Sequence, residues 1–339
     1  MQKCELSLNK GYLFNDFDSK INMFSLVFNC DDYNKNDCVF KPNQRYKSWE
    51  HVRQEFYEFY INNVKENKKS ITLNDKKHLA LHLAFYLASW GMYRGSSFLL
   101  QNDYLIHVPI VEEILNAKYD VLWNYNPSNI EETEQVANLL FGTKDEIGLV
   151  KKIKNHYLFY KKSSAVLYDE NDDSFVDDNL QTTSNELSEI LVTKIIMGTF
   201  GCLPAYDRFF ISGLKDKGVK SKLSKQNFLE LIDVVNNNFI SQINQFKIKK
   251  EFRNYTYMKF VDMYFWEHGY ELDVKSWFYD VDKNTRVNKV EKFLQNNKTK
   301  TRTIKKINAI KLRFERDNKE DRCDLQNDII DLCDKFLSK

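Results

Sequence analysis

The chain is predicted to be a mainly α-helical, multi-helix globular protein of roughly a dozen helices, because a large apolar fraction is combined with few helix-breaking residues. Of its 339 residues, 42% are hydrophobic and 14% are aromatic, which is enough to build a substantial core. Only 10 glycines and 4 prolines are present. All-β folds need more turn residues than this, so strand structure is expected only in a small irregular or β segment at the N-terminus.

Shifts in composition divide the chain into five segments. Residues 1–45 mix short apolar runs with polar loops, and we expect an N-terminal arm or a small strand pair there. Residues 46–168 are predicted to form one helical subdomain and residues 186–282 another, with an acidic loop at 169–185 between them. Residues 283–339 are predicted to form a basic C-terminal helical segment.

Apolar spacing predicts the helices of the first subdomain. After Ser48, a suitable N-cap, the apolar residues from Trp49 to Tyr60 recur mostly at spacings of three and four, as on an amphipathic helix. The next helix starts at residues 72–75 and is apolar nearly all round up to Trp90, which predicts burial at the domain centre. Further helices are expected at residues 109–125, 130–141 and 145–160.

The second subdomain is predicted to contain helices at residues 187–200, 226–246 and 254–268, and another helix is expected at 321–337. Asp207 precedes a further helix that begins at Arg208, and aspartate is a preferred N-cap.

Composition and missing motifs exclude several classes of protein. The six cysteines form no CxxC pair, so neither a zinc site nor a disulfide scaffold is expected from them. The N-terminus lacks an apolar run of signal-peptide length and no stretch is long enough to span a bilayer, which predicts a cytoplasmic protein without membrane contact. The chain has no GxxxxGK[ST], GxGxxG, HExxH or GxSxG motif, which argues against NTPases, nicotinamide enzymes, zincins and α/β-hydrolases.

The stretch at residues 195–210, IIMGTFGCLPAYDRFF, carries the strongest candidate for chemistry. An apolar helix runs into a Phe-Gly turn, and Asp207 follows among aromatic side chains with Arg208 beside it. A carboxylate in such surroundings must be solvated, paired with a cation or used in catalysis, because burial raises the free energy of its ionised form. The competing interpretation is that Asp207 is only a helix cap.

This stretch, with the helix before it, resembles the corresponding part of the helix-hairpin-helix DNA glycosylase superfamily over about 25 residues. The resemblance implies that Asp207 is the catalytic aspartate and that the fold is glycosylase-like. The matching hairpin, Asn185–Ile190, lacks the glycines with which the family grips a DNA phosphate, and Glu189 lies near the position of the lysine found in lyase-competent members. A monofunctional enzyme that needs no cofactor is therefore expected.

A second candidate site is SWGMYRGSS at residues 89–97. Trp90 and Tyr93 are candidates to stack on a base, while Arg94, Ser96 and Ser97 are candidates to bind a phosphate. Alternatively, the helix continues through this region, with its two glycines on one face for close packing. Tyr206 and Arg208 complete the predicted substrate-binding set.

The segment 283–316 has twelve Lys or Arg residues against two acids. Clustered cations gain free energy from counterion release on a polyanion, although a solvated charged face is an equally good explanation. The predicted contacts to the nucleic-acid backbone are Lys300, Arg302, Lys305, Lys306, Lys311 and Arg313.

The six histidines are scattered along the chain. His78 and His82 are four residues apart on one predicted helix, a spacing that suits a metal ion. Only Asp75 offers a nearby upstream carboxylate, and His82 lies in an apolar run. His82 is therefore predicted to be a core histidine, and no metal site is expected.

The leading functional hypothesis is a DNA-binding hydrolase that cleaves an N-glycosidic bond by base flipping, in DNA repair or antiviral defence. One alternative is a non-enzymatic helical protein that binds nucleic acid or a protein partner. A further alternative is a toxin or effector that acts on RNA or nucleotides.

Overall fold

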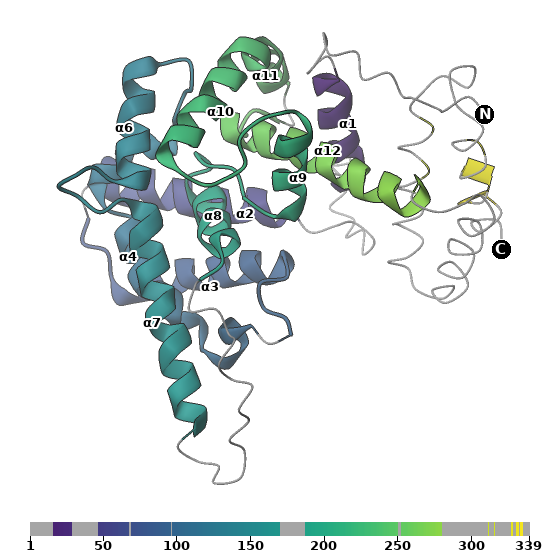
Figure 1. Ribbon diagram of the computed structural model, residues 1–339. Coiled ribbons are helices and arrows are strands. Elements are labelled where there is room, and N and C mark those ends of the chain that lie inside the picture. The colour runs from purple at the N-terminus through teal and green to yellow at the C-terminus, as the bar shows by residue number, and fades with distance from the viewer. Residues whose placement is uncertain are drawn as a thin grey trace, which may run out of the picture.

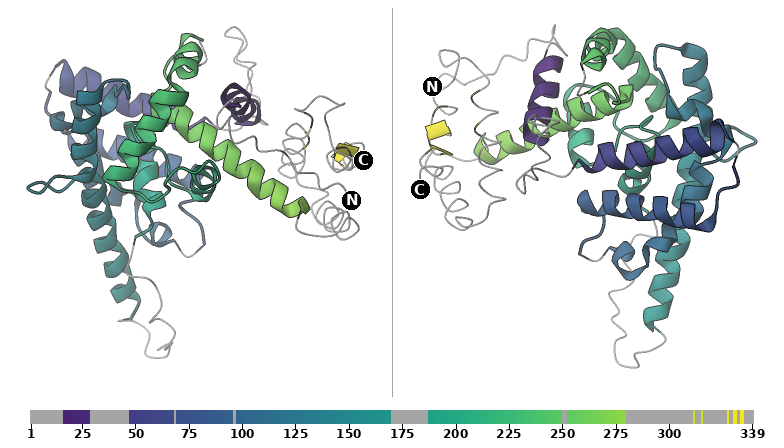
Figure 2. Two further views of the ribbon diagram at one scale, coloured as in Figure 1. Left: turned by 45° about the horizontal axis from the view of Figure 1, so that its top comes forward. Right: turned by 180° about the vertical axis from the view of Figure 1, so that it is seen from behind.

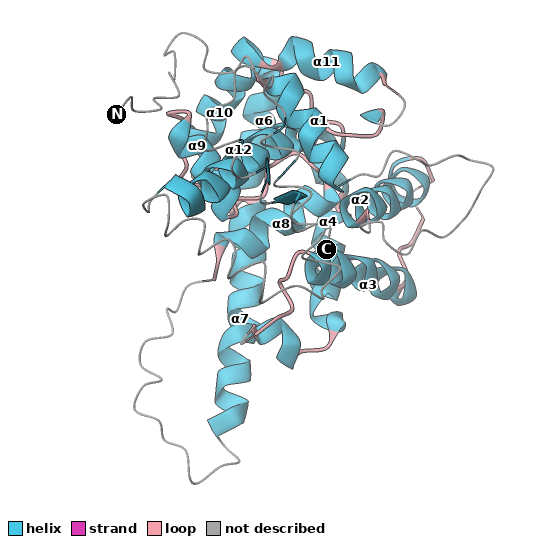
Figure 3. Cartoon of the chain, turned by 90° about the vertical axis from the view of Figure 1, so that its right-hand side faces the viewer, coloured by secondary structure: helices cyan, strands magenta, loops and turns pink. Residues whose placement is uncertain are grey.

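The computed structural model describes residues 16–28, 47–67, 69–95, 97–169, 187–249 and 252–279, together with residues 311, 315, 327, 330, 331, 333 and 334. These residues contain twelve α-helices and no strand, which confirms the predicted all-α class (Figure 1, Figure 3). The α-helices are α1 (Phe17–Phe28), α2 (Ser48–Phe59), α3 (Leu73–Ser89), α4 (Val108–Ile114), α5 (Asp120–Trp123), α6 (Ile130–Phe141), α7 (Leu149–Asp169), α8 (Glu189–Thr199), α9 (Arg208–Asp216), α10 (Lys225–Asn238), α11 (Ile240–Ile248) and α12 (Tyr257–Tyr279). None of the helices in the described part of the chain has both the length and the apolar character needed to cross a bilayer.

Helix α8 lies at the centre of the packed helices (Figure 1). Every residue from Leu191 to Thr199 is buried, and α2, α3 and α7 all pack against this helix. A helix that is apolar on all sides is stable only where neighbours cover all of its faces. The prediction assigned this role to α3, but Leu81 and Phe85 of α3 are each 52% exposed, so α3 keeps an outer face.

Helices α2 and α3 run side by side as an antiparallel pair (Figure 2, right). The connection contains a π-helical turn, η1 (Tyr60–Lys65), and ends at a capping box formed by Thr72 and Asp75. The predicted start of this helix at residues 72–75 is therefore confirmed. The N-cap of α2 is Lys47 rather than Ser48, which is the first residue of the helix.

Helices α9 and α12 make the most extensive helix–helix contact among the described residues, and α12 continues as a long rod beyond it (Figure 2, left). Glycines permit this approach: a Cβ added to Gly269 would lie 1.9 Å from the backbone oxygen of Phe209, and one added to Gly213 would lie 2.1 Å from that of Phe265. The backbones can touch only because neither glycine carries a side chain.

Several predicted element boundaries are wrong. The apolar run at 23–28, a candidate for the N-terminal strand pair, belongs to α1. The single helix expected at 109–125 is divided into α4, a 3₁₀ turn and α5, and the one expected at 226–246 is divided at Phe239. Helix α12 extends eleven residues past the predicted end at 268. By contrast, α6 has the predicted bounds, with Asn129 as its N-cap.

Candidate functional site

Asp207 is the N-cap of α9, as its position in the sequence predicts. Its Oδ1 accepts hydrogen bonds from the backbone N–H groups of Phe209 and Phe210, both at 3.1 Å. Its Oδ2 lies 3.3 Å from Nζ of Lys194 on α8, and the two side chains are only 15% and 5% exposed. The carboxylate thus satisfies a helix terminus and neutralises a buried cation.

Trp90, which was predicted to stack on a base, contacts the cation that is paired with Asp207. Nζ of Lys194 lies 4.5 Å from the centre of the Trp90 ring, which links Trp90 to Asp207 through a shared lysine. Tyr206 is buried in the core, and its hydroxyl has no hydrogen-bond partner among the described residues. Arg208 points outward, 73% exposed, with Asp273 at 3.7 Å.

The segment after α3 is a turn and not a continued helix, so the continued-helix alternative is wrong. Helix α3 ends at Ser89, and both Gly91 (φ 75°) and Gly95 (φ 60°) adopt the left-handed conformation that favours glycine. The exposed Arg94 folds back against Gly91. The two glycines therefore allow the chain to turn sharply here, while the stacking and phosphate-binding roles of the segment stay predictions.

The polar groups of this turn are engaged within the fold. The hydroxyl of Tyr93 lies 2.6 Å from Nε2 of His107, and Nδ1 of His107 forms a hydrogen bond with the Tyr157 hydroxyl. Ser97 donates to the carbonyl of Met92 and caps a 3₁₀ turn. Ser96 lies outside the described residues.

The basic segment is described only in small part. Lys311 is ion-paired with Asp334 at 2.6 Å and with Glu315 at 3.4 Å. The other predicted phosphate contacts, Lys300, Arg302, Lys305, Lys306 and Arg313, lie outside the described residues, as does the acidic loop beyond Asp169.

A pocket of about 440 Å³ lies away from Asp207, beside α2. Its volume is within the range typical of small-molecule sites. It is formed by α2, the residues that follow α5, the end of α11 and the turn that leads into α12. Six of its fifteen lining residues are aromatic: Trp49, Tyr57, Trp123, Tyr125, Tyr255 and Tyr257.

Arg53 is the most unusual residue of this pocket. It is 7% exposed, and its guanidinium lies over the Tyr57 ring at 4.5 Å and the Trp123 ring at 5.4 Å. Among the described residues, only Nη2 has a hydrogen-bond acceptor, the Trp123 carbonyl at 2.6 Å, whereas Nε and Nη1 have none. Burial lowers the pKa of Arg53 to about 10, so the group stays charged at neutral pH.

Two further cations line the pocket, Lys247 and Arg253. Burial, and next the charge of Arg53, lower the pKa of Lys247, whose ammonium donates to the Tyr255 carbonyl. Two carboxylates also line it: Glu50 accepts from the Tyr255 hydroxyl, and Glu58 accepts from Gln54 at 2.8 Å. Three cations therefore stand against two carboxylates, a small excess of positive charge that an anion would compensate.

The sequence contained one signal of this site. Arg53 follows Trp49 by four residues and stands on the buried stripe of α2 with Val52 and Phe56. A charged residue on such a stripe is rarely fully buried without a partner, so it marks a candidate site. The other walls come from elements far apart in the sequence, which no local pattern brings together.

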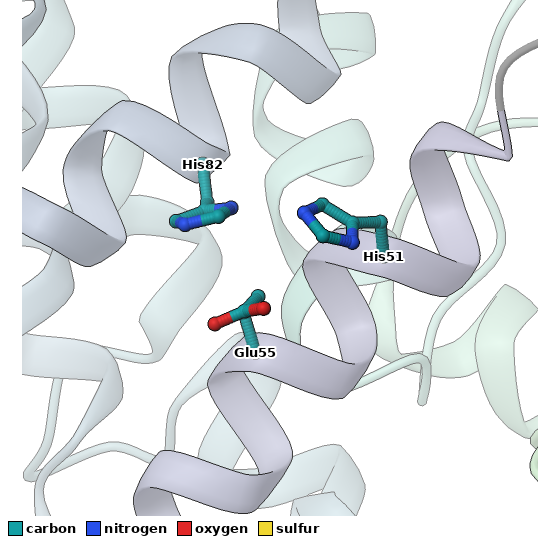
Figure 4. A group of neighbouring side chains, drawn as sticks. All are labelled: His51, Glu55 and His82. Carbon is teal, nitrogen blue, oxygen red and sulfur yellow. The ribbon is translucent and has the colours of Figure 1, made fainter.

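The structure also corrects the prediction for His82. This side chain is only half-buried, and it faces His51 and Glu55 (Figure 4). Its Nε2 also lies 3.2 Å from Nε2 of His78, so His82 is not a core histidine. No protein-family model, curated protein or solved structure matches this chain.

Proposed function

We propose that this protein binds DNA and takes one unpaired nucleotide into the pocket beside α2. The observation that carries the proposal is Arg53, a buried guanidinium with two nitrogens that lack acceptors in the part of the chain that the structure describes, at the wall of a pocket with six aromatic side chains. Leaving charged donors unpaired costs free energy, and a phosphate supplies the paired oxygens that a guanidinium binds best.

The aromatic side chains of the pocket suit the base of a nucleotide. Proteins that bind unpaired strands stack bases on aromatic rings and hold the backbone with cations. Tyr57 and Tyr257 are partly exposed at this pocket, and Lys247 and Arg253 stand beside Arg53. The basic segment 283–316 would add sequence-independent affinity for the rest of the strand.

Fluorescence anisotropy with a labelled single-stranded DNA oligomer tests this proposal. Replacing Arg53 by Met removes the charge and keeps most of the volume, and we expect binding about tenfold weaker or more, the worth of a charged hydrogen bond. The matched control is Lys220→Met, which removes one charge from an exposed pair with Glu230 and should change binding little. Equal binding by the Arg53→Met variant, tighter binding of RNA, or binding of AMP but not of the strand would each overturn the proposal.

Glycosylase activity at Asp207 is a second candidate. A carboxylate has about four acceptor positions, of which the two amides and Lys194 take three, so Oδ2 has room to orient one water. Duplexes with normal and modified bases, treated with the protein and then with alkali, should show strand breaks at abasic sites. Asp207→Asn should remove the breaks and leave DNA binding intact, whereas breaks that persist in this variant would exclude Asp207 as their cause.

A further inference from the structure

Three histidines and one glutamate meet between α2 and α3, on residues that the pocket does not use. Figure 4 shows three of them, His51, Glu55 and His82. His51 and Glu55 are four residues apart on α2, and His78 and His82 are four residues apart on α3. Side chains at this spacing share one face of a helix. Because the two helices are antiparallel, His51 lies beside His82 and Glu55 lies beside His78.

The distances among these groups are those of a ligand set. One nitrogen or oxygen each from His51, Glu55 and His82 lie within 4.8 Å of one another. Nε2 of His78 lies 3.2 Å from Nε2 of His82 and 3.7 Å from a carboxylate oxygen of Glu55. Ligands of a tetrahedral zinc ion at about 2.0–2.1 Å from the metal are roughly 3.3 Å apart, so small side-chain rotations would complete the geometry.

A hydrogen bond between His78 and His82 engages only two of the four groups. If both rings are neutral, the Nε2–H of one donates to the Nε2 lone pair of the other. Two protonated rings at that distance would repel each other. A divalent cation would engage the nitrogens of all three rings together with the carboxylate.

We propose that His51, Glu55, His78 and His82 form a binding site for a divalent transition metal ion of the zinc class. Imidazole nitrogen with one carboxylate oxygen suits zinc and its neighbours in the first transition row and does not suit the oxygen-seeking magnesium or calcium. The ion cross-links α2 and α3 near the middle of the antiparallel pair. Because α2 also carries Trp49, Arg53 and Tyr57 of the pocket, the metal fixes the helix on which that pocket is built.

Titration of the full chain with zinc chloride by calorimetry, after treatment with a chelator, tests the site. We expect one ion per chain and a higher unfolding temperature with zinc. His51→Asn and His82→Asn should each weaken binding by about 100-fold or more, since loss of even an indirect supporting contact costs 10–100-fold. His156→Asn is the matched control, because this histidine lies elsewhere, on α7, with its ring hydrogen-bonded to the Ile106 carbonyl.

Cobalt(II) provides a second measurement that does not depend on stability. The absorption spectrum of the cobalt complex should show tetrahedral bands without a thiolate charge-transfer band, because no cysteine belongs to the site. A thiolate band, no binding of either ion, or unchanged affinity in both the His51 and His82 variants would overturn the proposal. Unchanged affinity in His78→Asn would overturn the assignment of His78 as the fourth ligand.

Discussion

Lys194 and Asp207 show that residues that resemble a catalytic site can be needed for the stability of the fold. The ammonium of Lys194 lies on the most buried helix of the described structure and has the Asp207 carboxylate at 3.3 Å. Removing one partner of a buried pair leaves an uncompensated charge, which costs more than the pair itself contributes. Any test of Asp207 in catalysis must therefore separate the loss of the charge pair from the loss of chemistry.

We predict that Asp207→Asn lowers the free energy of unfolding by about 3 kcal/mol, because Lys194 is left buried without a counter-ion while the asparagine still caps α9. The double variant Lys194→Met/Asp207→Asn should recover most of this loss, since it removes both charges. Urea denaturation of the wild type, both single variants and the double variant gives the coupling free energy. Additive losses in the double variant would contradict the prediction.

His107 is a buried base that stays neutral. It is fully buried between the hydroxyl groups of Tyr93 and Tyr157. Burial, and next the nearby His156, lower the pKa of His107 to about 3. The ring therefore accepts a proton in the unfolded chain near its ordinary pKa of 6.5 but not in the folded protein.

We predict that the protein loses stability as the pH falls from about 6.5 towards 3, because in this window the unfolded state binds one more proton at His107. The slope from this residue is about 1.4 kcal/mol per pH unit at most. Urea denaturation at several pH values measures it, and His107→Gln should show a shallower dependence whatever its stability at neutral pH. Parallel curves for the two proteins would show that His107 does not titrate in this way.

At the scale of elements, local patterns predicted the existence of helices better than their ends. The N-caps of α3 and α9 and both bounds of α6 follow from side chains next to the helix terminus, so the sequence around Thr72, Asp207 and Asn129 was sufficient. The interruption after α4 coincides with a local cap, because the Asn116 side chain accepts from the Lys118 N–H. At the break after α10, by contrast, the Phe239 ring packs against Phe17 and Tyr264, which are distant in sequence. The same holds for the Arg53 pocket, whose walls come from separate helices and turns.

We predict that Gly269→Ala lowers the free energy of unfolding by at least about 3 kcal/mol, because its methyl group would force α9 and α12 apart. The added Cβ would lie 1.9 Å from the Phe209 oxygen. Gly218→Ala is the control for backbone strain: its φ is 71° but the space around it is open, so only about 1–2 kcal/mol is expected. Equal losses in the two variants, measured by urea denaturation, would show that helix contact is not the cause.

At the scale of the whole molecule, one hydrophobic cluster contains side chains from α1 through α12. The net charge of the entire chain is only +2, so attraction to a polyanion depends on where the cations are placed. The segment 283–316 has a large local excess of positive charge. Three more cations line the pocket beside α2. These two regions would act differently, since phosphate contacts along a strand depend strongly on salt.

We predict that replacing Lys300, Arg302, Lys305, Lys306 and Arg313 together by Gln makes DNA binding less dependent on salt. Each phosphate contact to a single strand contributes about 0.7 to the slope of log K against log salt concentration, so the slope should fall by about 3 to 4. Lys311→Gln should change the slope little, because Glu315 and Asp334 already neutralise this cation. Anisotropy titrations at several salt concentrations measure both slopes. If the fivefold variant keeps the wild-type slope, the basic segment does not contact the strand, and the salt dependence must come from the pocket and its surroundings.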